Sequence, residues 1–83
     1  MIDPDVWAEW QESRRGVLAG RDRLAHNVAV GLLILGHDPY NVMLLGMIEQ
    51  ARQLIEASNR QLDSMDRVRA WVEAADVPRI IQA

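Results

Sequence analysis

The sequence predicts an all-α fold, a helical hairpin whose turn lies at His37-Asp38-Pro39. Three observations support this prediction. The pairs Asp3-Pro4 and Asp38-Pro39 are typical of helix starts, because aspartate caps a helix N-terminus and proline suits its first turn. Apolar residues on both sides of the second pair recur at helical spacing. The 83 residues suffice for one small domain, 1–83, with a thin core.

The first helix is expected over residues 4–35. Its apolar stripe is formed by residues spaced by three, four or multiples of these, namely Trp7, Trp10, Val17, Leu24, Val28, Leu32 and Leu35. A glycine inside a helix costs about 0.5–1 kcal/mol relative to alanine, so Gly16 and Gly20 predict a bend near residues 16–20. The run 28–35 would also suit a buried strand, but no second strand-like run could pair with it. A helix is therefore favoured.

Residues 36–39 are expected to form the turn and residues 39–76 the second helix. Gly36 lies where the end of a helix places a residue with positive φ. The stripe of the second helix is Leu44, Met47 or Ile48, Ala51, Leu54 or Ile55, Ser58, Leu62, Met65, Val68 or Arg69, and Val72. Trp71 is expected to pack in the core near the end of this helix.

Charged side chains predict which face of the second helix is solvated. Acid-first pairs four residues apart favour ion pairs on an outer face, and two are present, Glu56 with Arg60 and Asp63 with Arg67. Pro78 restricts the residue before it, so the helix is expected to stop by position 76. Residues 77–83 would then form a tail.

The turn is surrounded by more apolar side chains than one hairpin can bury. Residues 32–35 and 42–48 point in all directions around their helices, and covering apolar area supplies ~25 cal/mol per Å². The sequence leaves two explanations open. Either the N-terminal segment folds back as a third helix, or the chain forms an oligomer or binds a partner protein. The candidate partner-binding residues are Trp7, Trp10, Leu33, Leu35, Tyr40, Met43, Leu45 and Met47.

The charge balance disfavours nucleic acid as a partner. The formal net charge is -3 and the pI about 5.2, whereas phosphate binding draws on clustered cations. All nine basic residues are arginine. The best candidate for a nucleic-acid contact is the basic cluster Arg14, Arg15, Arg21 and Arg23, although an exposed face or an interface with an acidic partner explains it better.

No catalytic, cofactor or metal motif is present in the sequence. His26 lies four residues after Asp22 and His37 precedes Asp38, but zinc-ligand spacings, phosphate loops and nucleophile elbows are absent. We therefore expect no enzyme, no cofactor and no metal site. The longest apolar run is too short to span a membrane, and the start of the chain lacks the features of a secretory signal, so a cytoplasmic location is expected.

Several segments of the second half resemble the needle subunits of type III secretion systems. They are Asp38-Pro39-Tyr40-Asn41, Leu44-Leu45-Gly46, Asn59-Arg60-Gln61, and the run through Val68, Trp71 and Ala75 to Ile80-Ile81. The family has a proline-asparagine turn, a Leu-Leu-Ala step, an Asn-Ala-Gln segment and an apolar C-terminal end at nearly these separations. The resemblance covers about half of the chain. It implies a helical hairpin that polymerises into a tube and is exported.

Together these observations predict a non-enzymatic protein–protein interaction module that acts through apolar helix faces. Small adaptors, chaperones and phage- or plasmid-encoded inhibitors of bacterial origin all fit that description. Such a module would self-associate or sequester a partner protein. The alternatives are a self-polymerising subunit like those of secretion needles, and a nucleic-acid-binding regulator that uses the basic cluster.

Overall fold

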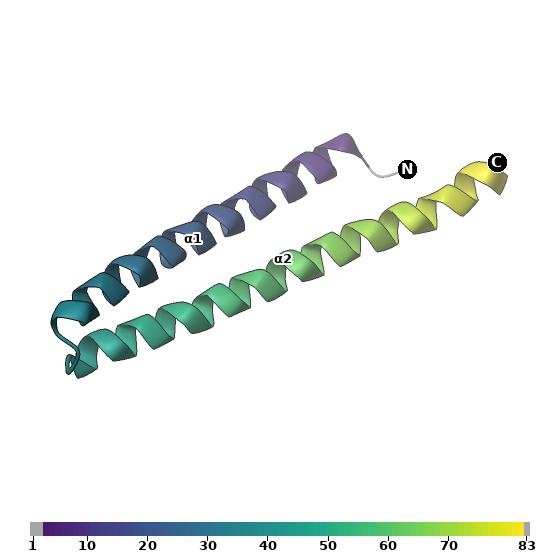
Figure 1. The fold of residues 1–83 in the computed structure, drawn as a ribbon. Helices are drawn as coiled ribbons and strands as arrows, with labels where there is room; N and C mark the ends of the chain where they lie inside the picture. Colours follow the sequence, from purple (N-terminus) through teal and green to yellow (C-terminus); the bar gives the residue numbers. More distant parts are fainter. Residues whose placement is uncertain (1–2, 83) are drawn as a thin grey trace.

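The computed structural model describes the backbone of residues 3–82 and the side chains of residues 3–75. The chain is a hairpin of two long antiparallel helices, α1 (Pro4–His37) and α2 (Val42–Gln82), as Figure 1 shows. The molecule is a rod with extents of 66 × 18 × 14 Å. The turn lies at one end of the rod and both chain termini lie towards the other. The predicted all-α helical hairpin is confirmed.

The first helix begins as its sequence predicts. The backbone N–H of Asp5 donates to Asp3 Oδ1 at 3.0 Å, and Pro4 occupies the first turn. The helix then continues without interruption through residues 16–20 to His37, and no described glycine has a positive φ. The free-energy cost of placing Gly16 and Gly20 inside a helix is therefore outweighed by the stability of the helical turns on either side. The segment with Trp7 and Trp10 is the first part of α1 and not a separate element.

The turn occupies residues 38–41, later than the predicted 36–39. The backbone N–H of Asp38 donates to the carbonyls of Ile34 and Leu35 at 3.1 and 3.2 Å, so Asp38 ends α1. Gly36 is still helical. Asn41 caps α2, since its Oδ1 accepts from the backbone N–H of Leu44 at 3.0 Å. The predicted start at residue 39 was wrong because Asn41 takes the cap and also donates to the Asp38 carboxylate at 3.2 Å.

The second helix also extends further than predicted. Its backbone is helical through Pro78 to Gln82, so the expected stop at residue 76 was wrong, and residues 77–82 do not form a separate tail. A proline lacks one N–H and leaves one carbonyl of the preceding turn without its helical partner. That loss falls close to the helix end, where few further hydrogen bonds depend on it. Ala83 lies outside the described residues.

The two helices face each other through a regular line of residues that we call the seam. Successive seam residues are alternately three and four positions apart, and each is partly or fully buried. On α1 they are Trp7, Trp10, Arg14, Val17, Arg21, Leu24, Val28, Gly31 and Leu35. On α2 they are Leu44, Ile48, Ala51, Ile55, Ser58, Leu62, Met65, Arg69 and Val72. This spacing is that of a coiled coil, here antiparallel within one chain.

The register of the seam is constant along the hairpin. Gly31 contacts Ile48 near the turn, and Arg69 lies over the ring of Trp10 near the other end. From the first pair to the second, α1 moves back by 21 residues and α2 moves forward by 21 residues. The pairing of the two helices therefore does not shift between these points. The predicted stripes are largely confirmed. Leu32, however, is exposed because Gly31, one position earlier, faces α2.

The core is thin. In the part of the chain with described side chains, only Gly31, Ile48 and Leu62 are fully buried. A Cβ atom added to Gly31 would lie 3.0 Å from Ile48 Cγ1 and 3.7 Å from Leu44 Cδ1. The backbone of α1 therefore approaches the side chains of α2 as closely as a glycine permits.

Two glycines of α1 should respond to substitution in opposite directions. Gly31→Leu should destabilise the hairpin by about 1–3 kcal/mol, because the new side chain overpacks the contact with Ile48. Gly16→Ala should stabilise it by about 0.5–1 kcal/mol, since a Cβ there meets nothing within 4 Å and alanine favours the helix. Circular dichroism with urea denaturation checks both variants. Equal effects of the two would contradict the close contact at Gly31.

Candidate interaction surfaces

At the end of the hairpin away from the turn, which we call the open end, two tryptophans and an arginine pack together. The rings of Trp7 and Trp10 meet edge to face with centroids 5.9 Å apart. The guanidinium of Arg69 lies 5.0 Å from the centroid of Trp7 and 4.9 Å from that of Trp10. Trp10 Nε1 also donates to the carbonyl of Met65 at 3.3 Å. Both predicted partner-binding tryptophans are thus engaged within the chain and are half-buried.

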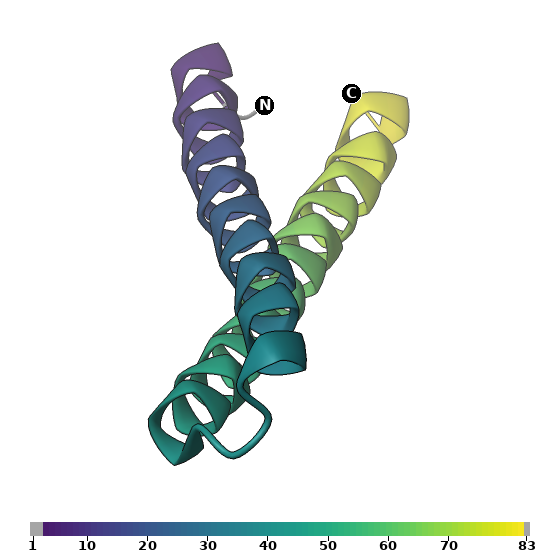
Figure 2. The ribbon, with the colours of Figure 1, turned by 60° about the vertical axis from the view of Figure 1, so that its left-hand side comes forward.

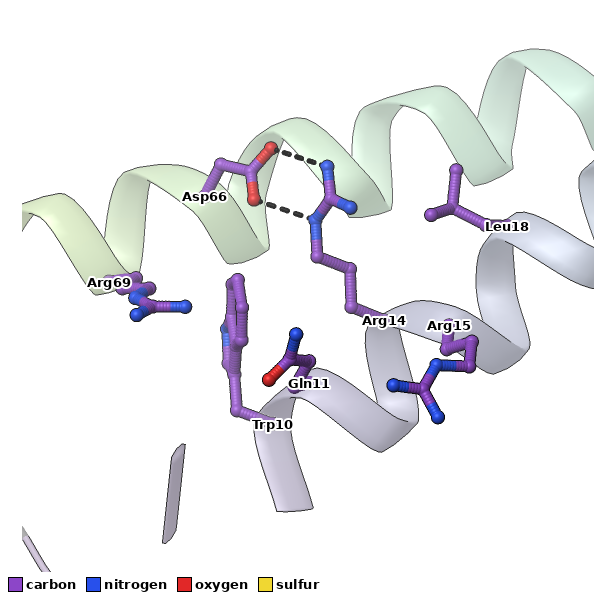
Figure 3. A pocket seen from close by; sticks show the side chains of 7 residues that line it. All are labelled: Trp10, Gln11, Arg14, Arg15, Leu18, Asp66 and Arg69. Atoms are coloured by element: carbon purple, nitrogen blue, oxygen red, sulfur yellow. Dashed lines mark hydrogen bonds and ion pairs between the residues drawn. The ribbon is translucent and has the colours of Figure 1, made fainter. Parts of the chain in front are cut away.

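A bidentate ion pair joins the helices beside these rings (Figure 3). Arg14 Nε and Nη2 donate to the two carboxylate oxygens of Asp66 at 2.8 and 3.1 Å. These donated hydrogen bonds hold the pKa of Asp66 below its usual value, and the positive charges of Arg14 and Arg69 act in the same direction. An open pocket of about 400 Å³ lies here, lined by Trp10, Gln11, Arg14, Arg15, Leu18, Asp66 and Arg69.

The predicted basic cluster does not form one continuous cationic surface. Arg14 reaches across to α2, whereas Arg15 pairs with Glu12 on its own helix at 3.2 Å. Arg21 Nη1 donates to Asn59 Oδ1 at 3.1 Å, and Arg21 also pairs with Asp22. For Arg23 no hydrogen bond or ion pair is found with the described residues. Most of the cluster is thus used to join or stabilise the helices.

The turn end of the rod carries a surface of exposed apolar side chains that we call the tip surface. Leu33 is 72% exposed, Tyr40 90% and Met43 78%. The full set is Leu32, Leu33, Ile34, Tyr40, Val42, Met43, Leu45 and Met47. It brings together five of the predicted partner-binding residues. Leu35 is the exception at this end, because it lies in the seam and is half-buried.

The structure also contradicts two predictions made for α2. Trp71 is 73% exposed and not in the core, because the neighbouring Val72 takes the seam position. Of the two predicted ion pairs, Asp63 with Arg67 is formed, while Glu56 and Arg60 are not paired with each other. Sequence reasoning missed the seam roles of Arg14 and Arg21, although both lie at three- or four-residue steps from apolar seam positions.

The described residues hold no group of three or more side chains that could bind a metal ion. His26 and His37 are exposed, and neither hydrogen-bonds to another side chain among the described residues. Neither described helix contains a stretch that is both long and apolar enough for a membrane span.

Comparisons with known proteins assign no family. No family model, curated protein or solved structure matches the chain.

The ion pair between the helices predicts a pH-dependent stability difference. Asp66→Asn should lower the urea midpoint at neutral pH, because the native carboxylate is stabilised by Arg14. The pKa of Asp66 is lower in the folded protein than in the unfolded chain, where it is about 3.9. Its ionised carboxylate therefore adds to the free energy of unfolding in full at pH values above about 3.9, and this contribution is lost as the pH falls through the pKa of the folded state. The two proteins should therefore converge in acid.

Urea denaturation at pH 7 and pH 2 measures this difference. Glu12→Gln is the matched control, since it removes an exposed ion pair within α1 and should change little at either pH. An Asp66→Asn deficit that persists unchanged at pH 2 would mean that packing, and not charge, is lost.

Proposed function

We propose that the chain is a non-enzymatic protein–protein interaction module, a small helical adaptor, chaperone or inhibitor that acts through apolar helix faces. The observation that carries this proposal is the tip surface. Its leucine, isoleucine, valine, methionine and tyrosine side chains all lie at the turn end of the rod and are exposed. Concentrations of exposed apolar side chains mark interaction sites in soluble proteins.

The thin core supports the same proposal. A two-helix hairpin covers one face of each helix, and here full burial is confined to three described positions on that face. Small domains without disulfides gain stability from a partner, and this chain has no cysteine. Covering the tip surface by self-association or by a partner protein would supply that stabilisation.

The composition of the tip surface favours a protein partner. Methionine is flexible and polarisable, and it is common on surfaces that adapt to apolar partners. Tyr40, in the turn, adds an aromatic ring of the type enriched in interface anchors. The nearby charges are few, so the contact would depend on apolar burial more than on ion pairs.

The double variant Met43→Glu/Met47→Glu tests the proposal. Neither residue belongs to the seam, so the helix content and unfolding midpoint of the monomer should be unchanged. Association should be lost, because two carboxylates would have to be buried without partners. Light scattering of the pure protein and co-purification from the native host measure the two forms of association.

The matched control is Ala8→Glu/Ala19→Glu, which adds the same charge at exposed positions of α1 outside the tip surface. The control should associate as the wild type does. The proposal is wrong if the wild-type protein is a stable monomer that captures no host protein, or if the tip variant retains every association of the wild type.

A further inference from the structure

A second unpartnered surface runs along α2. One position before each seam residue of α2 lies a residue without charge, and each of these residues is exposed. We call this line the uncharged stripe. It consists of Met43, Met47, Gln50, Leu54, Ala57, Gln61, Ser64, Val68 and Trp71. Its steps alternate between four and three residues, so it forms one continuous line beside the seam, starting at the tip surface.

The adjoining side of α1 carries few charges. Asn27 and Met47 line the same groove, so the position before a seam residue of α1 lies on the side of the stripe. The equivalent α1 positions are Val6, Glu9, Ser13, Gly16, Gly20, Arg23, Asn27, Val30 and Ile34, of which Glu9 and Arg23 are charged. The opposite side of the hairpin carries Arg15, Arg52, Glu56 and Asp66. On the side of the stripe, α2 contributes no charge and α1 contributes two.

The order of residues in the stripe suits pairing with itself in the antiparallel direction. Opposing Met43 to Val68 of a second copy also opposes Gln50 to Gln61, so an apolar pair and an amide pair form together. Met47 is opposed to the small Ser64. At the centre Leu54 meets the small Ala57, and a twofold axis passes between them. Trp71 then lies next to the turn of the other copy, where Tyr40 is exposed. An isologous twofold contact of this kind is closed.

The charges beside the stripe favour the same direction. On the outer flank of the stripe, away from the seam, Arg60 and Arg67 lie beside its second half, while the matching positions beside its first half, Gly46 and Gln53, are uncharged. Antiparallel copies place the two arginines beside these uncharged residues, whereas parallel copies would bring arginine beside arginine. Arg67 is already paired with Asp63, and Arg60 forms no ion pair with any described residue.

We infer that two copies of this chain pack α2 against α2 through the uncharged stripe, antiparallel about a twofold axis between Leu54 and Ala57. The product is a four-helix bundle. This inference rests on the proposed function and specifies its self-associating form. The second copy buries the methionines, Leu54, Val68 and Trp71, which the hairpin alone leaves in water.

Single-cysteine variants test the arrangement, because the natural chain has no cysteine. A mixture of Gln50→Cys and Gln61→Cys should form a disulfide-linked dimer in high yield under mild oxidation. Gln50→Cys alone should not, since the two copies of residue 50 would lie about 16 Å apart along the helices, beyond disulfide reach. Ala29→Cys, exposed on α1 away from the stripe, is the control for random collision.

Three outcomes would overturn the inference. Rapid self-linking of Gln50→Cys alone would indicate parallel packing. A ladder of larger species from the double variant Gln50→Cys/Gln61→Cys would indicate an open polymer instead of a closed dimer. Failure of the mixture to link above the Ala29→Cys level would exclude this interface.

A second measurement separates this inference from the proposed function. In sedimentation equilibrium, Leu54→Glu should raise the dimer dissociation constant at least about tenfold, while Gln53→Glu, one position away and facing the partner's basic half, should not. Met43 and Met47 belong to the tip surface as well as to the stripe, whereas Leu54 belongs to the stripe alone. A wild type whose association survives Leu54→Glu but is lost in Met43→Glu/Met47→Glu would therefore contradict the dimer and keep the proposed function.

Discussion

The alternation of three- and four-residue steps along both helices is the constraint on which the hairpin depends. Because the mean step is 3.5 residues, each helix keeps one face towards the other only by winding slightly around it. The helices accordingly cross, and they diverge towards the open end (Figures 1 and 2). Gly31 permits the close approach near the turn. The rings of Trp7 and Trp10 with Arg69 fill the wider space at the other end.

The arginines in the seam explain why this register is favoured over its neighbours. An apolar seam tolerates a shift of one heptad, since one leucine or valine can replace another. Arg14 and Arg21 do not, because each donates to a particular acceptor on α2, Asp66 and Asn59. Arg69 likewise requires the tryptophans opposite. The polar half of the seam thus specifies the register, while the half near the turn holds Gly31 and Ile48, two of the three fully buried residues.

The sequence predicted the two helices and the seam of α2, because spacing alone determines which face of a long helix is apolar. The sequence-based prediction was wrong where two nearby residues could each take the same structural position. Asp38 and Asn41 can both cap a helix, and only the backbone geometry decides between them. Gly31 carries no hydrophobic signal, so the neighbouring Leu32 was assigned to the seam although glycine fits the close approach.

Similar competition explains the errors of placement among the candidate site residues. Trp71 and Val72 are adjacent and both apolar, and the register of the whole seam, which no short window contains, places Val72 inside. Arg14 and Arg21 were assigned to an exposed cluster because charge usually indicates a solvated face. Their long side chains instead lie along the seam with their charged ends at its edge.

The distribution of charge over the hairpin is difficult to explain by folding alone. A helix that meets water on most of its surface gains solubility from charges at any exposed position, and α2 has them on its other exposed faces. Yet the uncharged stripe omits them over about eight helical turns and carries methionine, leucine, valine and tryptophan in water. The hairpin does not need this omission, because the seam is complete without the stripe. The absence of charge along the whole stripe therefore supports the inferred contact with a second copy.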